Sequence, residues 1–396
     1  MDIKELDNEY VAHALPIYSV AHAYGRFDVC LTQGKGSTLY DDKGKKYIDF
    51  GSGIGVTAFG ICDEIWKDAV IEQLSKVQHT SNLYYTYPCA ELAKLLCEKT
   101  GMKKVFFGNS GAEANEGAIK FARKYSFDKY GEGRSTIITL KDSFHGRTIT
   151  TLAATGQDEF HTTFGPFTDG FKYCPANDCE ALKEMATNDV CAIMFECIQG
   201  EGGVNNLTQE FVDTIAKIAK EKDILTIVDE VQTGNGRTGR YFAYENYSIK
   251  PDIVSTAKGL AGGLPMGAVL FGEKVADCVT PSSHGSTFGG NPIAAAGAIS
   301  IVKRIDDEFL QKVREKSKYI TDFIKNIKGV KAITGMGLML GIETDKQASD
   351  IAKQCLENGL LVLTAHKNRV RLLPALNISY DEIDEGLKIL KEVIEK

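Results

Sequence analysis

The chain has 396 residues and a formal net charge of -7 at pH 7, with an isoelectric point near 5.6. Its length predicts one large domain with a smaller domain beside it. The acidic balance argues against nucleic acid and against an anionic membrane surface as partners, because both bind a basic face.

The thiols and the N-terminal segment bear on the compartment. Ten cysteines occur without a CxxC pair, and the seven histidines form no paired ligand spacing. Neither a disulfide framework nor a metal site is therefore predicted. The opening "MDIKELDNEYVAHALP" has no signal-peptide pattern, and no apolar run approaches the roughly 20 residues of a membrane span. We expect a soluble cytoplasmic protein with reduced thiols.

Periodicity divides the chain into three regions. Residues 1–50 contain "GSTLYDDKGKKYIDF", two short runs about a turn at 42–44, and are interpreted as an N-terminal arm or part of the small domain. Residues 51–290 form the predicted large domain. Its apolar runs alternate with helical stretches and are typical of a mostly parallel sheet covered on both faces. These runs are 105–107, 136–140, 190–196, 225–231, 252–256 and 267–271.

The pattern changes after Asn291-Pro292. A long helical stretch, about 292–328, precedes the strand-like runs "GLMLGIET", "GLLVLT" and "RVRLLPAL", with helices between and after them. Residues 291–396 are therefore predicted to form a smaller α+β domain, and the fold class is α/β.

The first chemical motif is "FFGNSGAEANEGAIKFARKY" at 106–125, a strand, a tight turn and a helix. Ser110 and Gly111 open the helix, where free amides suit a phosphate. The alternative is that Ser110 is an ordinary helix cap.

The next motifs follow predicted strands in the same way. "SFHGRT" supplies Phe144 and Arg147, and "FECIQGEGGV" supplies Glu196 and Glu201. Arginine binds carboxylates with a planar fork, whereas Phe144 alone could be part of the core.

The run "LTIVDEVQTGNGRTG" contains a GxGxxG pattern at 234, 236 and 239. The following "RYFAYENYSIKP" lacks helical periodicity, so a dinucleotide site is not favoured. Asp229 ends the buried strand, and its carboxylate needs a partner. It could form a structural ion pair or hold a cationic ring nitrogen.

Lys258 follows the predicted strand at 252–256 and precedes several glycines. It is either a solvated lysine or an amine in a pocket that lowers its pKa. "HGSTFGGNP" presents Ser286 and Thr287, which suit a phosphate or a plain turn. Arg371, in "RVRLLPAL", could form a surface ion pair.

Taken in order, these motifs resemble the class III, pyridoxal-phosphate-dependent aminotransferases over nearly the whole chain. The resemblance implies the aspartate-aminotransferase type of fold (fold type I) and a homodimer whose active sites lie at the subunit boundary. "HTSN" at 79–82 resembles the acetylornithine branch of the class, and Ile54 stands where ornithine aminotransferases carry a tyrosine.

The same resemblance implies roles for individual residues. Lys258 would bind the aldehyde of pyridoxal 5'-phosphate and move the substrate proton, and Asp229 would pair with the ring nitrogen. The other cofactor-binding residues would be Ser110, Gly111, Ala112, Phe144, Glu230, Val231, Gln232 and, from the neighbouring subunit, Thr287.

The implied substrates are N2-acetylornithine and 2-oxoglutarate, the latter converted to glutamate. Arg147 would bind the carboxylate far from the reacting amine, and Arg371 the near one. Glu201 would pair with Arg371 when that carboxylate is absent. Glu196, Tyr24 and the partner's Ser286 would complete the substrate side.

Other activities of the class stay open, namely transamination of ornithine, succinylornithine, succinyl-diaminopimelate or 4-aminobutyrate, and an aminomutase reaction. A non-catalytic protein on the same fold is a further alternative.

Overall fold

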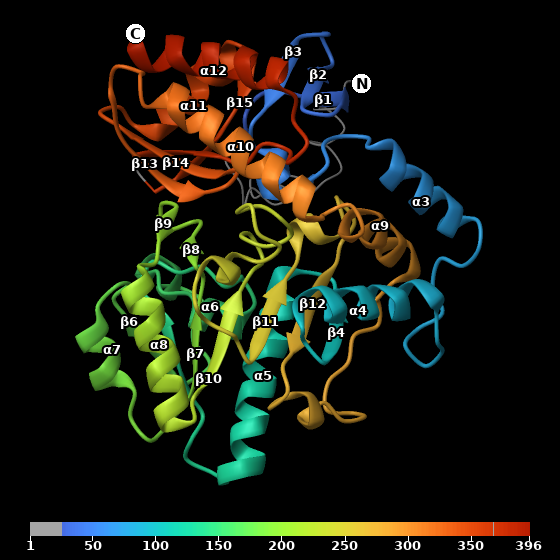
Figure 1. The fold of residues 1–396 in the computed structure, drawn as a ribbon, viewed down its shortest axis with the longest axis vertical. Helices are drawn as coiled ribbons and strands as arrows, with labels where there is room; N and C mark the ends of the chain where they lie inside the picture. The colour runs from blue at the N-terminus through green and yellow to red at the C-terminus, as the bar shows by residue number, and fades with distance from the viewer. Residues whose placement is uncertain (1–25, 367) are drawn as a thin grey trace.

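The computed structural model describes residues 26–366 and 368–396. Its largest sheet has seven strands in the order β4-β12-β11-β10-β7-β5-β6 (Figure 1). The strands are β4 (Lys104–Gly108), β5 (Thr136–Leu140), β6 (Phe171–Cys174), β7 (Val190–Phe195), β10 (Leu225–Asp229), β11 (Ile253–Thr256) and β12 (Gly267–Phe271).

All six predicted strands of this sheet are present, and the sheet is mostly parallel. The observed sheet differs from the predicted one towards each of its two edges. β12 is antiparallel to both β11 and β4, because the short segment 257–266 holds no crossover helix. β6 was not predicted, since it is a short strand at the sheet's end whose first three residues are only half-buried.

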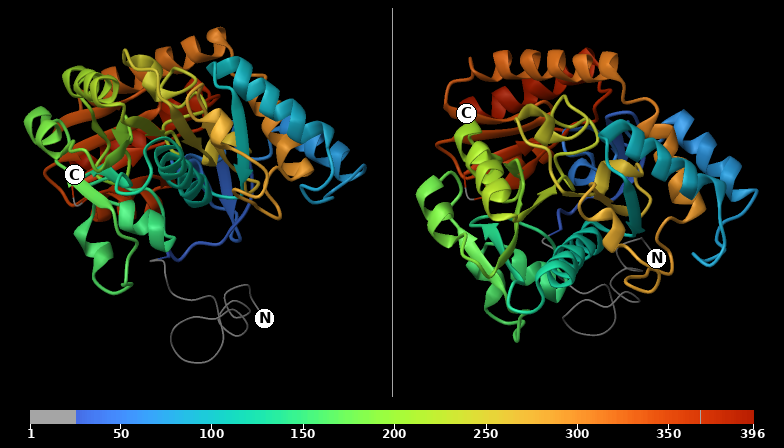
Figure 2. Two further views of the ribbon diagram at one scale, coloured as in Figure 1. Left: turned by 90° about the horizontal axis from the view of Figure 1, so that it is seen from below. Right: turned by 60° about the horizontal axis from the view of Figure 1, so that its bottom comes forward.

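Helices cover both faces of the large sheet (Figures 1 and 2). Successive residues of β10 point to opposite sides. Ile227 packs with Ile119 of α5 (Gly111–Tyr130), whereas Val228 lies in the core with Ile215 of α8 (Gln209–Lys222). This alternation explains the continuous apolar run, since a strand buried on both faces needs apolar side chains on each.

The remaining helices and short strands of this region connect these layers. They are α2 (Ser52–Gly55), α3 (Glu64–Leu74), α4 (Tyr87–Thr100), α6 (Ile149–Ala154), α7 (Cys179–Met185), β8 (Ile198–Gln199) and β9 (Asn205–Asn206). No helix of the described segments is both long and apolar enough to cross a lipid bilayer.

A second sheet, of order β13-β14-β17-β16, is antiparallel and lies in the C-terminal region (Figure 1). Its strands are β13 (Val330–Met336), β14 (Met339–Thr344), β16 (Leu363–Ala365) and β17 (Arg369–Leu372), and its helices are α11 (Ala348–Glu357) and α12 (Tyr380–Glu395). The predicted helical stretch 292–328 is two helices, α9 (Pro292–Val302) and α10 (Asp307–Ile324), because Asp306 caps a new helix through the amide of Phe309.

The two short runs about the turn at 42–44 are β2 (Thr38–Asp41) and β3 (Lys46–Asp49), which form an antiparallel hairpin after β1 (Leu31–Lys35). β3 also pairs in parallel with β15 (Leu360–Leu361). The run "GLLVLT" is thus divided between two sheets, and residues from both ends of the chain share one sheet (Figure 1).

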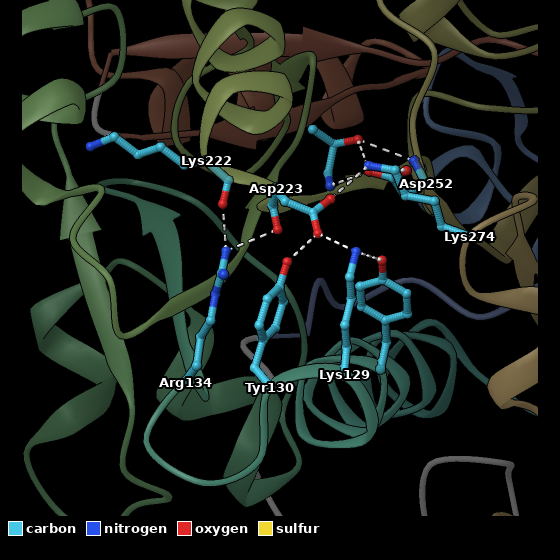
Figure 3. Close-up of polar contacts among 9 residues, drawn as sticks. Lys129, Tyr130, Arg134, Lys222, Asp223, Asp252 and Lys274 are labelled. Atoms are coloured by element: carbon cyan, nitrogen blue, oxygen red, sulfur yellow. Dashed lines mark hydrogen bonds and ion pairs between the residues drawn. The ribbon is translucent and has the colours of Figure 1, made fainter.

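A polar cluster fixes the far end of α8 (Figure 3). Asp223 is the C-cap residue and has left-handed backbone angles, φ 49° and ψ 47°. Its carboxylate accepts hydrogen bonds from Lys129 Nζ at 2.6 Å and from the Tyr130 hydroxyl. Arg134 Nη2 donates to the carbonyl oxygen of Asp223 at 2.9 Å. The cluster therefore joins α8 to the end of α5.

The charge of Asp223 makes a prediction for stability. Burial alone would raise the pKa of this carboxyl, but the bonds from Lys129 and Tyr130 lower it to about 2, below the ordinary 3.8. A depressed folded-state pKa stabilises the fold above the unfolded pKa, and that stability is lost as the pH falls from about 4 towards 2.

Asp223→Asn should lower the free energy of unfolding by about 1 kcal/mol at pH 7, after allowance for solvent screening, and by less at pH 3. Asparagine tolerates the left-handed backbone, so the change isolates the charge. Urea unfolding at the two pH values measures it. Asp128→Asn is the control, since Asp128 pairs with Lys124 within a single helix, α5. An equal loss in both variants would contradict the assignment.

Candidate active site

A cavity of about 400 Å³ lies at the carboxyl edge of the large sheet. The carboxyl ends of parallel strands meet at one edge, so residues far apart in the chain gather there. The predicted residues that line it are Ser110, Gly111, Ala112, Phe144, Arg147, Glu196, Glu201, Asp229, Val231, Gln232 and Lys258.

Lys258 follows β11 directly, and its side chain lines the cavity. Its φ of 43° lies in the left-handed region, which is unfavourable for a residue with a side chain. Burial lowers the pKa of Lys258 and the nearby Arg371 acts in the same direction, whereas Glu201 opposes them. Of the two interpretations left open by the sequence, the structure therefore favours the pocket amine.

Asp229 ends β10 and is only 3% exposed. Its Oδ2 accepts a hydrogen bond from Asn115 Nδ2 at 2.7 Å and lies 2.8 Å from Nδ1 of His145. Its Oδ1 accepts from the amide of Val231 at 2.9 Å. With Asp229 ionised, the contact requires the proton on Nδ1 of His145. The buried carboxylate is thus held in one orientation.

Sequence reasoning missed the parts of Asn115 and His145 in this network. Asn115 also donates to the carbonyl oxygen of His145 at 2.7 Å, and both residues are buried. A signal existed, because Asn115 occupies the same helical stripe as Ala112, Ile119 and Ala122 of α5. A polar residue inside an apolar stripe indicates a buried hydrogen-bond partner.

The start of α5 is shaped for an anion. Ser110 is the N-cap, and its hydroxyl accepts from the amide of Glu113 at 3.1 Å. No acceptor among the described residues pairs with the amides of Gly111 and Ala112. A Cβ on Gly111 would lie 2.6 Å from Val231 Cγ1, so only glycine fits against that side chain. Free amides at a helix N-terminus suit the phosphate of pyridoxal phosphate.

Arg371 of β17 does not itself line the cavity, but it reaches the wall from the second sheet and forms a two-pronged ion pair with Glu201, which does line it. Nη1 lies 2.8 Å from Oε1 of Glu201, and Nη2 lies 3.2 Å from Oε2. Burial would raise the pKa of Glu201, but its contacts with Arg371 lower it. Gln232 joins the pair, since its Oε1 accepts from Arg371 Nη1 at 2.9 Å.

Phe144, Arg147 and Glu196 form another part of the wall. The guanidinium of Arg147 lies 5.3 Å from the centre of the Phe144 ring, and Arg147 is exposed. Oε2 of Glu196 accepts from the amide of Phe144 at 3.1 Å. Burial and the charge of Asp229 raise the pKa of Glu196 well above its ordinary value.

Several predicted residues lie elsewhere. Glu230 does not enter the cavity, because its carboxylate accepts from the hydroxyl of Thr233 and the amide of Tyr244. Ser286 and Thr287 line a second cavity of about 390 Å³. Tyr24 lies outside the described residues.

Ile54 lines a separate apolar cavity, whereas Val56 belongs to the wall of the 400 Å³ cavity. The described part of the chain holds no cluster of three or more histidine, cysteine or acidic side chains arranged for a metal ion.

The chain is similar to known proteins over nearly its whole length. The family model "Aminotransferase class-III" matches residues 19–394. Acetylornithine aminotransferase of Haemophilus ducreyi is 50% identical, covering 99% of this chain and 98% of its own. The protein of that name from Methanocaldococcus jannaschii is 45% identical over 93% and 94%.

Solved structures agree. N-acetylornithine aminotransferase from Stenotrophomonas maltophilia has a TM-score of 0.83 at 37% identity, covering 94% of this chain and 97% of its own. Ornithine aminotransferase from Toxoplasma gondii has a TM-score of 0.90 at 30% identity, covering 95% and 92%.

The network around Asp229 makes a prediction. Asn115→Leu keeps the number and branching of the side-chain atoms but removes two buried hydrogen bonds, and we expect a loss of about 1–3 kcal/mol in unfolding free energy. Chemical denaturation of the cofactor-free protein measures it. Thr139→Val is the matched control, because the buried hydroxyl of Thr139 has no hydrogen-bond partner. A loss of unfolding free energy in Thr139→Val as large as in Asn115→Leu would contradict the stabilising role assigned to the hydrogen bonds of Asn115.

Proposed function

The chain belongs to the class III aminotransferases, which use pyridoxal 5'-phosphate, and we propose that its substrates are N2-acetyl-L-ornithine and 2-oxoglutarate. The products are N-acetylglutamate 5-semialdehyde and glutamate, a step of arginine biosynthesis. The observation that carries this proposal is the ion pair that Arg371 forms with Glu201 on the wall of the cavity that Lys258 also lines. The names of the similar proteins support it.

The residues present fit the cofactor. The amides of Gly111 and Ala112, with Ser110, would hold its phosphate at the start of α5, and Asp229 would hold the ring nitrogen in its protonated form. Phe144 would lie against the ring, and Gln232 would reach its phenolic oxygen. When bound, the group supplies an aldehyde for the amine and a ring that takes up electrons from the substrate carbon.

Lys258 would carry the proton. Burial lowers the pKa of its amine, so a larger share of it is neutral and able to take the proton from the carbon that bears the substrate amine. The same amine then returns the proton during transfer to the second substrate. Because Lys258 lies on the wall of the cavity, it can face the substrate throughout.

The two arginines would recognise two substrates with different carboxylates. Acetylornithine has a carboxylate far from its reacting amine, which suits Arg147 at the exposed edge of the cavity. Glutamate has a second carboxylate beside the amine, which suits Arg371. With acetylornithine bound, Arg371 would be a buried unpaired cation, at a cost of about 1–3 kcal/mol or more. Its bond to Glu201 removes that cost.

We also propose a homodimer whose partner completes each site. Apolar side chains stand exposed beside the second cavity, with exposed fractions of 71% at Tyr84 and 91% at Tyr87. Such a patch is typical of a protein interface. Ser286 and Thr287 line that cavity. In a dimer formed through this face, these two residues of one subunit would reach the active site of the other.

We assign the enzyme to the cytoplasm, because all ten cysteines are free thiols and such thiols persist in a reducing compartment. Ornithine is the second candidate for the amine. It is favoured by the structural likeness to the ornithine aminotransferase of Toxoplasma gondii.

Purified protein loaded with pyridoxal phosphate should be yellow, and borohydride should fix the cofactor to Lys258. Acetylornithine should be the preferred amine in a panel with ornithine, succinylornithine, succinyl-diaminopimelate and 4-aminobutyrate, with 2-oxoglutarate as acceptor. Lys258→Ala should lose both fixation and turnover, because no other amine can replace it. A clear preference for free ornithine would overturn the proposed substrate.

Glu201→Ala should impair the reaction with acetylornithine and improve that with amines that need a free Arg371. The reason is that the variant leaves Arg371 unpaired except by substrate. Single-turnover rates with acetylornithine and with glutamate measure the split. Glu343→Ala is the matched control, since Glu343 pairs with the neighbouring Arg369. Equal losses of rate with both amines in Glu201→Ala would contradict the proposal that Arg371 exchanges Glu201 for a substrate carboxylate.

A further inference from the structure

The GxGxxG run that follows β10 is a buried loop. Its glycines, Gly234, Gly236 and Gly239, are followed by a short 3-10 helix, Ala243–Asn246, and not by the α-helix of a dinucleotide site. Two of the side chains between these glycines, Asn235 and Arg237, are each only 2% exposed. Neither lines the active-site cavity.

Asn235 holds the backbone that leads to Lys258. Its Nδ2 donates to Thr256 Oγ1 at 3.0 Å and to the carbonyl oxygen of Ala257 at 3.3 Å. Lys258 comes next and has a left-handed φ of 43°. An unfavourable backbone conformation persists only where neighbours fix it, and Asn235 supplies that fixation at the preceding residues.

Arg237 holds the second sheet from the same loop. Its Nη1 donates to the carbonyl oxygens of Leu338, at 3.1 Å, and of Pro374, at 2.5 Å. The main-chain carbonyl of Arg237 accepts from the amide of Leu338 at 2.9 Å. A Cβ on Gly337 would lie 2.4 Å from that carbonyl oxygen, so the segments at 237 and 337 are in direct backbone contact.

These contacts lie at the ends of the strands that place Arg371. Leu338 precedes β14, and Gly341 of β14 pairs with Arg371 of β17. Pro374 is three residues beyond Arg371. Arg237 therefore ties down both strands of that pair beside the active site.

Burying the guanidinium of Arg237 costs free energy, because the charge loses its hydration. Among residues 26–366 and 368–396 no carboxylate forms an ion pair with it, and its Nη2 has no hydrogen-bond partner. Burial lowers the pKa of the guanidinium to about 9, and the charge of Asp49, beyond ion-pair distance, opposes that shift. A buried cation without an ion-pair partner is costly, so its two side-chain hydrogen bonds to carbonyl oxygens do not by themselves account for an arginine at this position.

We propose that the 234–239 loop positions both ends of the reacting substrate. Asn235 fixes the amine of Lys258, and Arg237 fixes the guanidinium of Arg371, so the loop sets the separation between proton transfer and carboxylate binding. Both are positioning residues, since neither lines the cavity. The assignment of Arg371 to a carboxylate rests on the function proposed above.

Arg237→Met tests the Arg371 end in the holoenzyme. We expect KM for 2-oxoglutarate and Kd for glutarate, an unreactive dicarboxylate, to rise about tenfold, while the half-reaction with acetylornithine changes less than about twofold. Amide hydrogen exchange in 369–376 should quicken about tenfold, with 225–229 unchanged. Exchange needs no substrate, so it reports on Arg237 even where the proposed substrates fail.

Arg237→Lys should give intermediate values, because one ammonium can still reach a carbonyl, and it serves if Arg237→Met does not fold. Arg304→Met is the matched control, since Arg304 binds Asp63 through both Nη atoms away from the cavity and should leave these constants unchanged. Unchanged exchange in 369–376 would overturn the proposal. So would equal losses in both half-reactions.

Asn235→Ala tests the Lys258 end. It should slow both half-reactions about tenfold and change the pH dependence of the bound cofactor's absorbance, while the Kd for glutarate stays within about twofold. A purely structural role would leave that pH dependence unaltered. A larger effect of Asn235→Ala on glutarate binding than on the absorbance would contradict the division between the two residues.

Discussion

The burial of several charges around one cavity is the constraint on which the rest of the structure depends. Asp229, Glu196, Lys258 and Arg371 all lie where water is scarce, and an isolated charge there is costly. The structure accommodates these charges in three ways. Asp229 and Glu196 accept hydrogen bonds from amides and from Asn115, Arg371 pairs with Glu201, and Lys258 responds by a lowered pKa.

These partners come from different layers of the fold, which explains why the site needs two sheets. The large sheet supplies the amine and the carboxylate of Asp229 at the ends of adjacent strands β11 and β10. The antiparallel sheet supplies Arg371. In the proposed reaction, the substrate carboxylate and the substrate amine would be recognised by residues of separate sheets, and their relative placement would depend on the contacts between the sheets.

Much of this could be read from the sequence, for identifiable reasons. Lys258 and Asp229 stand at the ends of apolar runs of strand length. Because the carboxyl ends of parallel strands converge at one edge of a sheet, the sequence pattern predicts that the two residues lie close together. Glu230 could not be separated from Asp229 in the same way. Its carboxylate turns towards Thr233 and Tyr244, a tertiary contact with no periodic signal. Arg237 and Asn115 have buried roles that depend on elements far away in the chain, and the antiparallel course of β12 depends on a connection too short for a crossover.

The pairing of β3 with β15 has a consequence for biosynthesis. Leu373 donates its amide to Phe50, and Glu382 accepts from Ser37, so the last part of the chain completes the packing of the first. Translation delivers residues 37–50 more than 300 positions before these partners. The large sheet, whose strands all lie within 104–271, can assemble on the ribosome, while the early hairpin waits with its strand edge unpaired. Such an edge is a template for wrong pairing, so the early hairpin stays open to misassociation until residues 360–361 of β15 have been made.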